Sequence, residues 1–243
     1  MTQTDITLDM IAGAERLFGV SYSQAERQQM LDNLEGQIAS ALQRRAVPLA
    51  NSVPMAMRFD PRLPGFTMPH GADALRLSAV TAPLPATDED IAFAPVTHLA
   101  AWIKSGALTS RRLTQIYLDR IASLGPKLEC FAVVTADLAL AEADAADALT
   151  RGGVNLGFLH GIPYGVKDLF DTKGVVTGWG AEPFRNRVPD ADAFIVTRLR
   201  SAGAVLLGKT TVGALAYNDI WYGGVTRNPW NLNEGSTRVP WRR

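Results

Sequence analysis

A strand, a helix and a second strand follow one another late in the chain, and this succession constrains the fold most. Residues 164–166 form a short apolar stretch, and residues 192–202 carry apolar side chains at helical spacing up to Gly203. Residues 204–207 are apolar throughout, which is typical of a strand buried on both faces of a sheet. Two strands joined by a helix predict a parallel pair with a right-handed crossover, so the fold class is α/β.

Two helices are predicted upstream of this unit. Thr97 is in position to cap a short helix that ends at Lys104, and Ser110 is in position to cap a longer one. The Gly125-Pro126 pair is predicted to end the longer helix, because proline cannot continue a helix. The buried stripe of the longer helix is expected to consist of Leu113, Ile116, Tyr117, Ile121 and Leu124.

A further strand and helix are predicted between these helices and the parallel pair. Residues 130–135 are apolar and β-branched, which favours a strand, and residues 137–150 form an alanine-rich helix that is acidic at its start. Cys130 lies in the predicted strand and is expected to be an inert buried thiol. It is the only cysteine, so the chain cannot form an internal disulfide, which fits a reducing compartment.

The first half of the chain has a different texture. Residues 1–47 predict a helical extension with two helices, and Ser23 and Glu26 form a capping box for the second. Residues 48–95 hold eight of the fourteen prolines and predict an extended linker that wraps the surface. The apolar stripes of the two helices consist of Ile6, Met10, Ala14, Leu17 and Phe18, and of Leu31, Leu34, Ile38 and Leu42.

Composition and charge exclude several classes of function. The chain has 24 basic and 24 acidic residues with no block of like charge, so neither a nucleic-acid partner nor a membrane surface is expected. No apolar run is long enough for a membrane span, and the first residues lack the features of a signal peptide. The expected location is the cytoplasm. His98 and His160 have no acidic partner at ligand spacing, so no metal and no cofactor are expected.

Residues 203–210 match the phosphate-loop pattern letter for letter, but the local structure argues against that function. In a phosphate loop, a strand precedes the first glycine and free backbone amides fill the space between the glycines. Here a predicted helix precedes Gly203, and the residues before Gly208 are the predicted strand itself. Nucleotide binding therefore stays a minor alternative.

Several segments in a fixed order resemble the amidase signature family. The resemblance covers residues 96–236 and is carried by Leu108-Thr109-Ser110, by Gly161-Ile162-Pro163-Tyr164-Gly165-Val166-Lys167-Asp168, by residues 189–193 and 202–209, and by residues 222–230, which end with Asn228-Pro229-Trp230. The family implies a mixed sheet flanked by helices and hydrolysis of carboxamide C–N bonds. Its enzymes use two serines and a lysine, in which one serine attacks the carbonyl and a second, held by a cis peptide, relays the proton to the lysine.

The resemblance assigns two residues of this chain to that chemistry. Lys167 matches the lysine base, and Ser236 matches the relaying serine, whereas no residue matches the nucleophilic serine. A lysine base must be neutral, and a free lysine has a pKa of ~10.4, so Lys167 would need burial or a nearby positive charge. Its place at the end of an apolar strand makes partial burial the expectation. Asp168, on the other side of the strand, is expected to be structural.

The last residues depart from the family. Residues 237–243 do not continue the glycine- and serine-rich run that would supply the nucleophile and the oxyanion hole, so a truncated, inactive form is hypothesised. Three alternatives stay open: an amidase acting on a small amide substrate, the amidase subunit of a transfer-RNA-dependent amidotransferase, and a non-catalytic fragment or binding scaffold. An incompletely covered sheet would also favour self-association.

Overall fold

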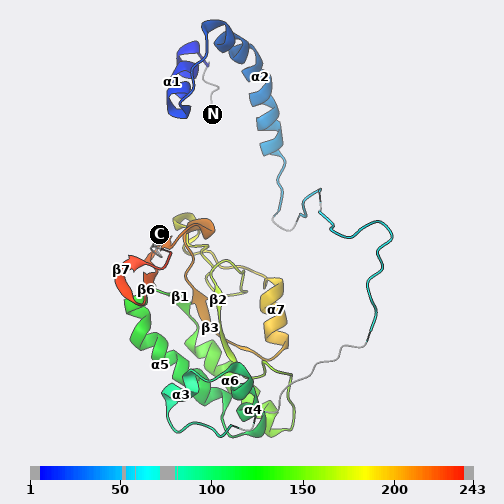
Figure 1. Ribbon diagram of the computed structural model, residues 1–243, viewed down its shortest axis with the longest axis vertical. Coiled ribbons are helices and arrows are strands. Elements are labelled where there is room, and N and C mark those ends of the chain that lie inside the picture. The colour runs from blue at the N-terminus through cyan, green and yellow to red at the C-terminus, as the bar shows by residue number, and fades with distance from the viewer. Residues whose placement is uncertain (1–5, 51–52, 58, 72–79, 81, 238–243) are drawn as a thin grey trace. The chain divides into compact units, whose positions relative to one another are not determined.

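The computed structural model describes residues 6–50, 53–57, 59–71, 80 and 82–237. The chain forms two compact units, Met1–Asp73 and Ala74–Arg243 (Figure 1). The first unit is a helical hairpin followed by an extended segment. The second unit contains the sheets and all the residues that the sequence assigned to the site.

The first unit begins with the two predicted helices, α1 (Leu8–Phe18) and α2 (Gln24–Ala46). The capping box at the start of α2 is confirmed: Ser23 Oγ accepts from the Glu26 amide, and the Glu26 carboxylate accepts from the Ser23 amide. A two-pronged ion pair joins the helices, in which the Arg27 guanidinium contacts both oxygens of the buried Glu15 carboxylate at 2.7 Å. Polar contacts at one end of the hairpin thus fix how the helices meet.

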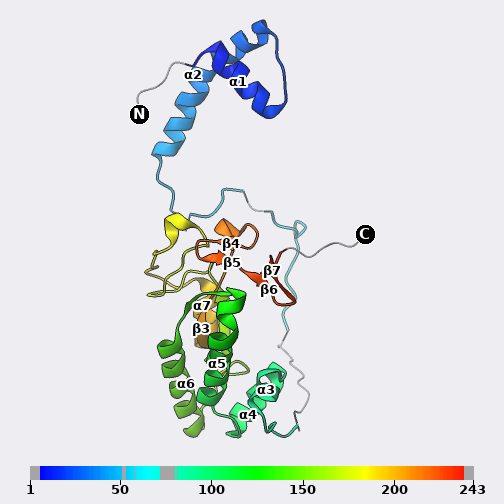
Figure 2. The same cartoon turned by 90° about the vertical axis from the view of Figure 1, so that its left-hand side faces the viewer.

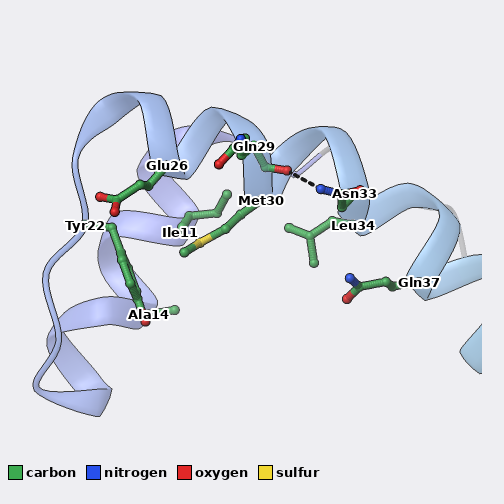
Figure 3. Close-up of a pocket in the computed structure, with 9 residues that line it drawn as sticks. All are labelled: Ile11, Ala14, Tyr22, Glu26, Gln29, Met30, Asn33, Leu34 and Gln37. Carbon is green, nitrogen blue, oxygen red and sulfur yellow. Dashed lines mark hydrogen bonds between the residues drawn. The ribbon is translucent and has the colours of Figure 1, made fainter.

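The apolar stripes of the hairpin are only partly covered. Leu17 and Phe18 are 87% and 82% exposed, and no residue of α2 is fully buried. An open groove runs between the helices, where Figure 3 shows Ile11 of α1 beside Met30 of α2. The residues that line this groove are Ile11, Ala14, Tyr22, Glu26, Gln29, Met30, Asn33, Leu34 and Gln37.

The described residues between 47 and 71 form neither helix nor strand, as their prolines predicted. They expose several large apolar side chains, namely Leu49, Val53, Met55, Met57, Phe59, Leu63, Phe66 and Met68. Whether this segment wraps the surface of the second unit stays a prediction.

Three helices open the second unit: α3 (Asp88–Ala92), α4 (Val96–Ser105) and α5 (Ser110–Leu128). They share a core whose buried members are Ile91, Leu99, Trp102, Ile103, Leu108, Leu113, Ile116 and Ile162. The short helix α3 lies within the proline-rich region, and the Trp102 indole N–H donates to the Ala82 carbonyl at 2.9 Å. Residues 82–95 therefore take part in this core.

The predicted caps of α4 and α5 were each displaced by one or two residues. The residue before α4 is Pro95, whose side chain makes no capping hydrogen bond. Thr97 therefore lies inside the first turn. Thr109 caps α5 by accepting from the Arg112 amide at 3.1 Å. Ser110 is instead fully buried, and its hydroxyl donates to the Gly161 carbonyl at 2.7 Å. Tertiary contacts, which spacing along the chain does not reveal, decided its role.

The prediction that Gly125-Pro126 ends α5 was also wrong. The helix continues to Leu128 and ends at Glu129, which has a left-handed backbone conformation. A proline in the last turn removes only one hydrogen bond, which a helix near its end can lose. The Glu129 carboxylate then accepts from the Val225 amide at 2.7 Å, and this contact supports the unusual conformation.

The main sheet has three strands, β1 (Phe131–Val134), β2 (Pro163–Lys167) and β3 (Val205–Thr210), in the order β1-β3-β2. β2 and β3 are parallel, and α7 (Phe194–Ser201) lies between them in the chain, so the predicted strand–helix–strand unit is confirmed. β1 pairs antiparallel with β3, which makes the sheet mixed. In the described part of the chain, β1 and β2 each have a strand neighbour on one side only.

Helices cover both faces of this sheet (Figure 1). On one face, α5 and α6 (Ala136–Arg151) pack on Val205 and Leu207, where the small side chains of Ala139 and Ala143 let the helix approach closely. On the other face, Val196 of α7 packs on strand residues of β2 and β3. The fold is the α/β class that the sequence predicted.

Two small hairpins lie near the C-terminal ends of the parallel strands (Figure 2). They are formed by β4 (Ile220–Trp221) with β5 (Gly224–Val225), and by β6 (Arg227–Asn228) with β7 (Asn231–Gly235). Two single-turn 3-10 helices, η1 (Glu182–Phe184) and η2 (Ala214–Ala216), complete the connections. None of the helices in the described residues is long and apolar enough to cross a membrane.

Candidate active site

Lys167 is the last residue of β2, where it pairs with Thr210 of β3. Its ammonium donates to the carbonyl of Thr211 at 3.1 Å. The residue is exposed, so the expectation of partial burial was wrong. The strand ends at this residue, and only one neighbouring strand flanks it, so its long side chain reaches the surface of the described unit.

A short path of hydrogen bonds leads from Lys167 towards Ser236. Thr211, whose carbonyl holds the lysine, also shares a hydrogen bond of 2.6 Å between its hydroxyl and that of Thr226. The carbonyl of Thr226 accepts from the Ser236 amide at 2.7 Å. Among the described residues, Lys167 makes no direct hydrogen bond to Ser236. The two residues assigned from the sequence are therefore joined through two threonines.

Asp219 holds the residue after Ser236 and lies close to Gly235 before it. Its carboxylate accepts from both the amide and the hydroxyl of Thr237, at 3.0 and 2.7 Å. A Cβ at Gly235 would lie 1.9 Å from that carboxylate, so a larger residue before the serine would displace the Asp219 side chain. Ser236 itself is exposed. No peptide bond among the described residues is cis, so the cis geometry implied for a relaying serine is not present at Ser236.

The lysine that is buried is Lys209 of β3, which the sequence reasoning missed. Its exposed fraction is 0%, and it is among the largest side chains that the described residues bury completely. Its ammonium donates to the carbonyl of Phe170 and, at 2.9 Å, to the hydroxyl of Thr172. Burial lowers its pKa to about 8, while the nearby carboxylates of Asp168 and Asp171 act in the opposite direction.

A sequence signal for this burial existed. Lys209 extends the apolar run that starts at residue 204, and a strand buried on both faces buries its polar members too. The phosphate-loop pattern to which Lys209 belongs is rejected as a nucleotide site by its predicted local structure. That rejection agrees with the structure, because residues 205–210 form β3 and Gly203 follows α7.

Asp168 is structural, as predicted, and lies fully buried next to Lys167 in the chain. Both of its carboxylate oxygens accept from the Gly178 amide, at 3.2 and 3.1 Å, and its backbone carbonyl accepts from the Trp179 amide. Burial raises the pKa of this carboxyl, and hydrogen bonds from Gly178 and the charge of Lys209 oppose that rise. Asp168 thus anchors the long loop between β2 and α7.

A second anchor holds the same loop from outside. The Arg187 guanidinium contacts both oxygens of Asp171, at 2.7 and 2.6 Å, and lies 4.1 Å from the centre of the Trp179 ring. This ion pair lowers the pKa of the Asp171 carboxyl. The loop that follows Lys167 is therefore fixed by polar contacts on its buried side and on its exposed side.

Two other residues singled out from the sequence have packing roles. His160 is 1% exposed, and its Nε2 lies 3.1 Å from both the Thr150 hydroxyl and the Ala146 carbonyl. Cys130 is partly buried, which raises the pKa of its thiol, and its carbonyl accepts from the Thr211 amide. Neither side chain reaches Lys167.

The fold and this geometry define an α/β protein with a lysine and a serine at the C-terminal end of its parallel strands. The Amidase family model matches residues 112–237, just over half of the chain. The chain belongs to the amidase family, as its sequence motifs indicated. The matched region contains both Lys167 and Ser236.

Individual relatives agree with this assignment. One subunit of the glutamyl-tRNA(Gln) amidotransferase of Bdellovibrio bacteriovorus is 35% identical over 154 residues, which cover 62% of this chain and 30% of that protein. The corresponding protein of Thiobacillus denitrificans is 42% identical over 139 residues, which cover 56% of this chain and 28% of that protein. Among solved structures, the peptide amidase PAM in complex with the competitive inhibitor chymostatin matches with a TM-score of 0.56 and 39% sequence identity. The match covers 60% of this chain and 32% of that one. The matched region thus spans about 30% of the length of the first of these relatives.

Proposed function

We propose that this chain is part of an amidase that hydrolyses the C–N bond of a small or aryl carboxamide, with Lys167 as the base and Ser236 as the relaying serine. The observation that carries the proposal is the path from the Lys167 ammonium through Thr211 and Thr226 to the Ser236 backbone. Its contacts link Lys167, at the end of β2, with the backbone of Ser236, which follows β7, and these are the two residues that the family resemblance selected.

The chemistry requires both groups. An amide is a poor electrophile with a poor leaving group, so the attacking hydroxyl must lose a proton and the departing amine must gain one. A serine between the nucleophile and the lysine would pass that proton in each direction. The lysine has to be neutral to accept it.

The 243 residues by themselves are proposed not to turn over substrate. The resemblance requires a nucleophilic serine and the amides of an oxyanion hole, and no residue of this stretch matches them. A fluorophosphonate probe, which labels activated serines, tests this proposal on the purified chain. We expect no labelling. Labelling that disappears in Lys167→Ala would show that the chain is catalytic by itself.

The hydrolase proposal is tested on a protein that contains this stretch together with the remainder of an amidase fold. We expect it to release ammonia or amine from a small carboxamide and to be labelled by the fluorophosphonate. Lys167→Ala should abolish both, and Lys104→Ala, which changes an exposed lysine on α4, should change neither. Full turnover in Lys167→Ala would remove the lysine from the mechanism.

A second candidate function is the amidase subunit of a transfer-RNA-dependent amidotransferase. Two relatives that are 35% and 42% identical to this chain support it, because both are subunits of a glutamyl-tRNA(Gln) amidotransferase. The two candidates differ in what they need. A free-standing amidase hydrolyses simple carboxamides without partner subunits, whereas the amidotransferase component is expected to do so poorly until its partners are added.

Self-association through the sheet is a separate proposal. It is supported by the edges of β1 and β2, each of which has a strand neighbour on one side only in the described residues. Size-exclusion chromatography over a range of concentrations is expected to show species larger than one chain. A concentration-independent monomer would contradict it.

A further inference from the structure

Lys209 has a property that packing alone does not explain. A lysine with an exposed fraction of 0% has lost its hydration, and burying a charged group is costly unless polar partners compensate. A methionine of similar length would fill the same space in β3 without that cost. The partners that the lysine has in this position should therefore indicate what it does.

Those partners all lie on the segment that follows Lys167. The Lys209 ammonium donates to the Phe170 carbonyl and to the Thr172 hydroxyl, and the Thr172 hydroxyl also donates to the Phe170 carbonyl at 3.2 Å. The Phe170 amide in turn donates to the Lys167 carbonyl at 3.0 Å, which closes a tight turn. The buried lysine therefore holds the turn in which Lys167 is the first residue.

The two lysines are also linked through the sheet. Lys209 pairs with Val166 and the next residue, Thr210, pairs with Lys167, while Thr211 supplies the carbonyl that the Lys167 ammonium contacts. The segment 209–211 thus fixes Lys167 at both ends: its backbone through the turn that Lys209 holds, and its amine through Thr211.

We propose that Lys209 is a positioning residue for Lys167, which keeps the turn from residue 167 to residue 170 closed so that the Lys167 amine stays on the Thr211 carbonyl. The proposal rests on the proposed function, because positioning matters to catalysis only if Lys167 is the base. Lys209 itself is fully buried and does not reach solvent. The nearby charged side chains of Asp168, Asp171 and Arg187, unlike Lys209, do not contact the Phe170 carbonyl.

Competitive acylation of the chain tests this inference without any need for turnover. The chain is treated with limiting acetic anhydride, and the modification of each lysine is followed by mass spectrometry at several pH values. The variant is Lys209→Met, the matched control is Lys104→Met, and the internal references are the exposed Lys104 or Lys127. Circular dichroism confirms that each variant is folded at the temperature used.

In Lys209→Met we expect Lys167 to be acylated roughly three- to tenfold faster relative to the references, the effect of losing about one hydrogen bond. The control should leave the Lys167 rate unchanged. A folded Lys209→Met with an unchanged Lys167 rate and pH profile would overturn the proposal, since a merely structural lysine changes stability and not the reactivity of a neighbour.

If Lys209→Met does not fold, Thr172→Val provides the same test, because it keeps the lysine and removes only one of its acceptors. We expect a smaller acceleration of Lys167 in the same direction, and no acceleration would again overturn the proposal. Serine labelling is not involved in this measurement. Absence of fluorophosphonate labelling in a complete amidase would therefore contradict the proposed function alone. An unchanged acylation rate of Lys167 would contradict the positioning role alone.

Discussion

The two lysines at the ends of β2 and β3 occupy opposite environments. Around Lys209, the buried cluster of Asp168, Thr172, Thr177 and Lys209 has an exposed fraction of 0% at every member. Around Lys167, the path towards Ser236 starts and ends on exposed residues and is buried only at Thr211. Lys209 of β3 pairs with Val166, the residue before Lys167 in β2. One step along the paired strands therefore separates the two environments.

This difference shows how the fold divides its polar groups. The buried cluster holds the loop after β2, and its cost in desolvation is offset by hydrogen bonds to backbone groups of that loop. The exposed path contributes less to stability and leaves Lys167 accessible. Substitutions in the first region should therefore act mainly on stability, and substitutions in the second mainly on chemistry.

The largest effect is expected for Lys209→Met. The change leaves the Phe170 carbonyl without its charged donor and removes the positive charge that stabilises the buried Asp168 carboxylate. We expect the free energy of unfolding to fall by roughly 2–4 kcal/mol. Urea unfolding followed by circular dichroism measures this, with Lys104→Met as the control. A loss below the error of the measurement would mean that the buried cluster is not what stabilises the loop.

The pH dependence of stability should show a slightly smaller effect of the same lysine. The folded pKa of Lys209, about 8, lies below its ordinary value of 10.5, so the unfolded chain binds more protons between these pH values. The free energy of unfolding should therefore rise from pH 8 to pH 10.5, by at most about 3 kcal/mol from this group. Below pH 8 the full cost of the buried charge is present.

Comparison with Lys209→Met isolates that contribution, because the other lysines and tyrosines titrate in both proteins. The difference in unfolding free energy between the two should widen as the pH rises through this window. Parallel pH profiles would show that Lys209 does not lose its proton there.

Thr226→Val breaks the path between Lys167 and Ser236 and should have a moderate effect. It removes the hydroxyl contact to Thr211 but keeps the Thr226 carbonyl that accepts from Ser236. The expected loss of stability is about 1 kcal/mol. In a protein with a complete amidase fold, fluorophosphonate labelling should slow as well. Unchanged labelling would mean that the threonine path plays no part in the reaction.

The smallest effect on stability is expected for Lys167→Met. The residue is exposed, and exposed substitutions usually change the free energy of unfolding by no more than about 0.5 kcal/mol. The same change should abolish labelling in a complete amidase. A stability loss as large as that of Lys209→Met would erase the contrast between the two lysines.

Much of the fold was predictable from local patterns. The parallel pair β2–β3 followed from an apolar run, a helical stripe and a glycine, and the capping box of Ser23 and Glu26 followed from spacing alone. The errors came where a distant partner intervened. Ser110 was expected to cap α5, but it is buried against the Gly161 carbonyl, and Pro126 was expected to end the helix, which continues to Leu128.

The site was predicted less completely than the fold. The motif around Lys167 selected the lysine, and the resemblance selected Ser236, but neither indicated the two threonines that join them. Thr211 and Thr226 are 15 positions apart in the chain, and no local periodicity relates them. Lys167 was expected to be partly buried because it ends an apolar strand, yet the buried amine belongs to the neighbouring strand.

The sequence by itself determined the class of the fold, the family and the identity of the candidate base, because these depend on side-chain patterns and motifs within short segments. Only the tertiary structure decided which lysine is buried and which is exposed. Burial depends on the strands, helices and loops that close around a side chain from distant parts of the sequence. For Lys209 these are the loop after β2 and the sheet, and for Lys167 they are a single neighbouring strand.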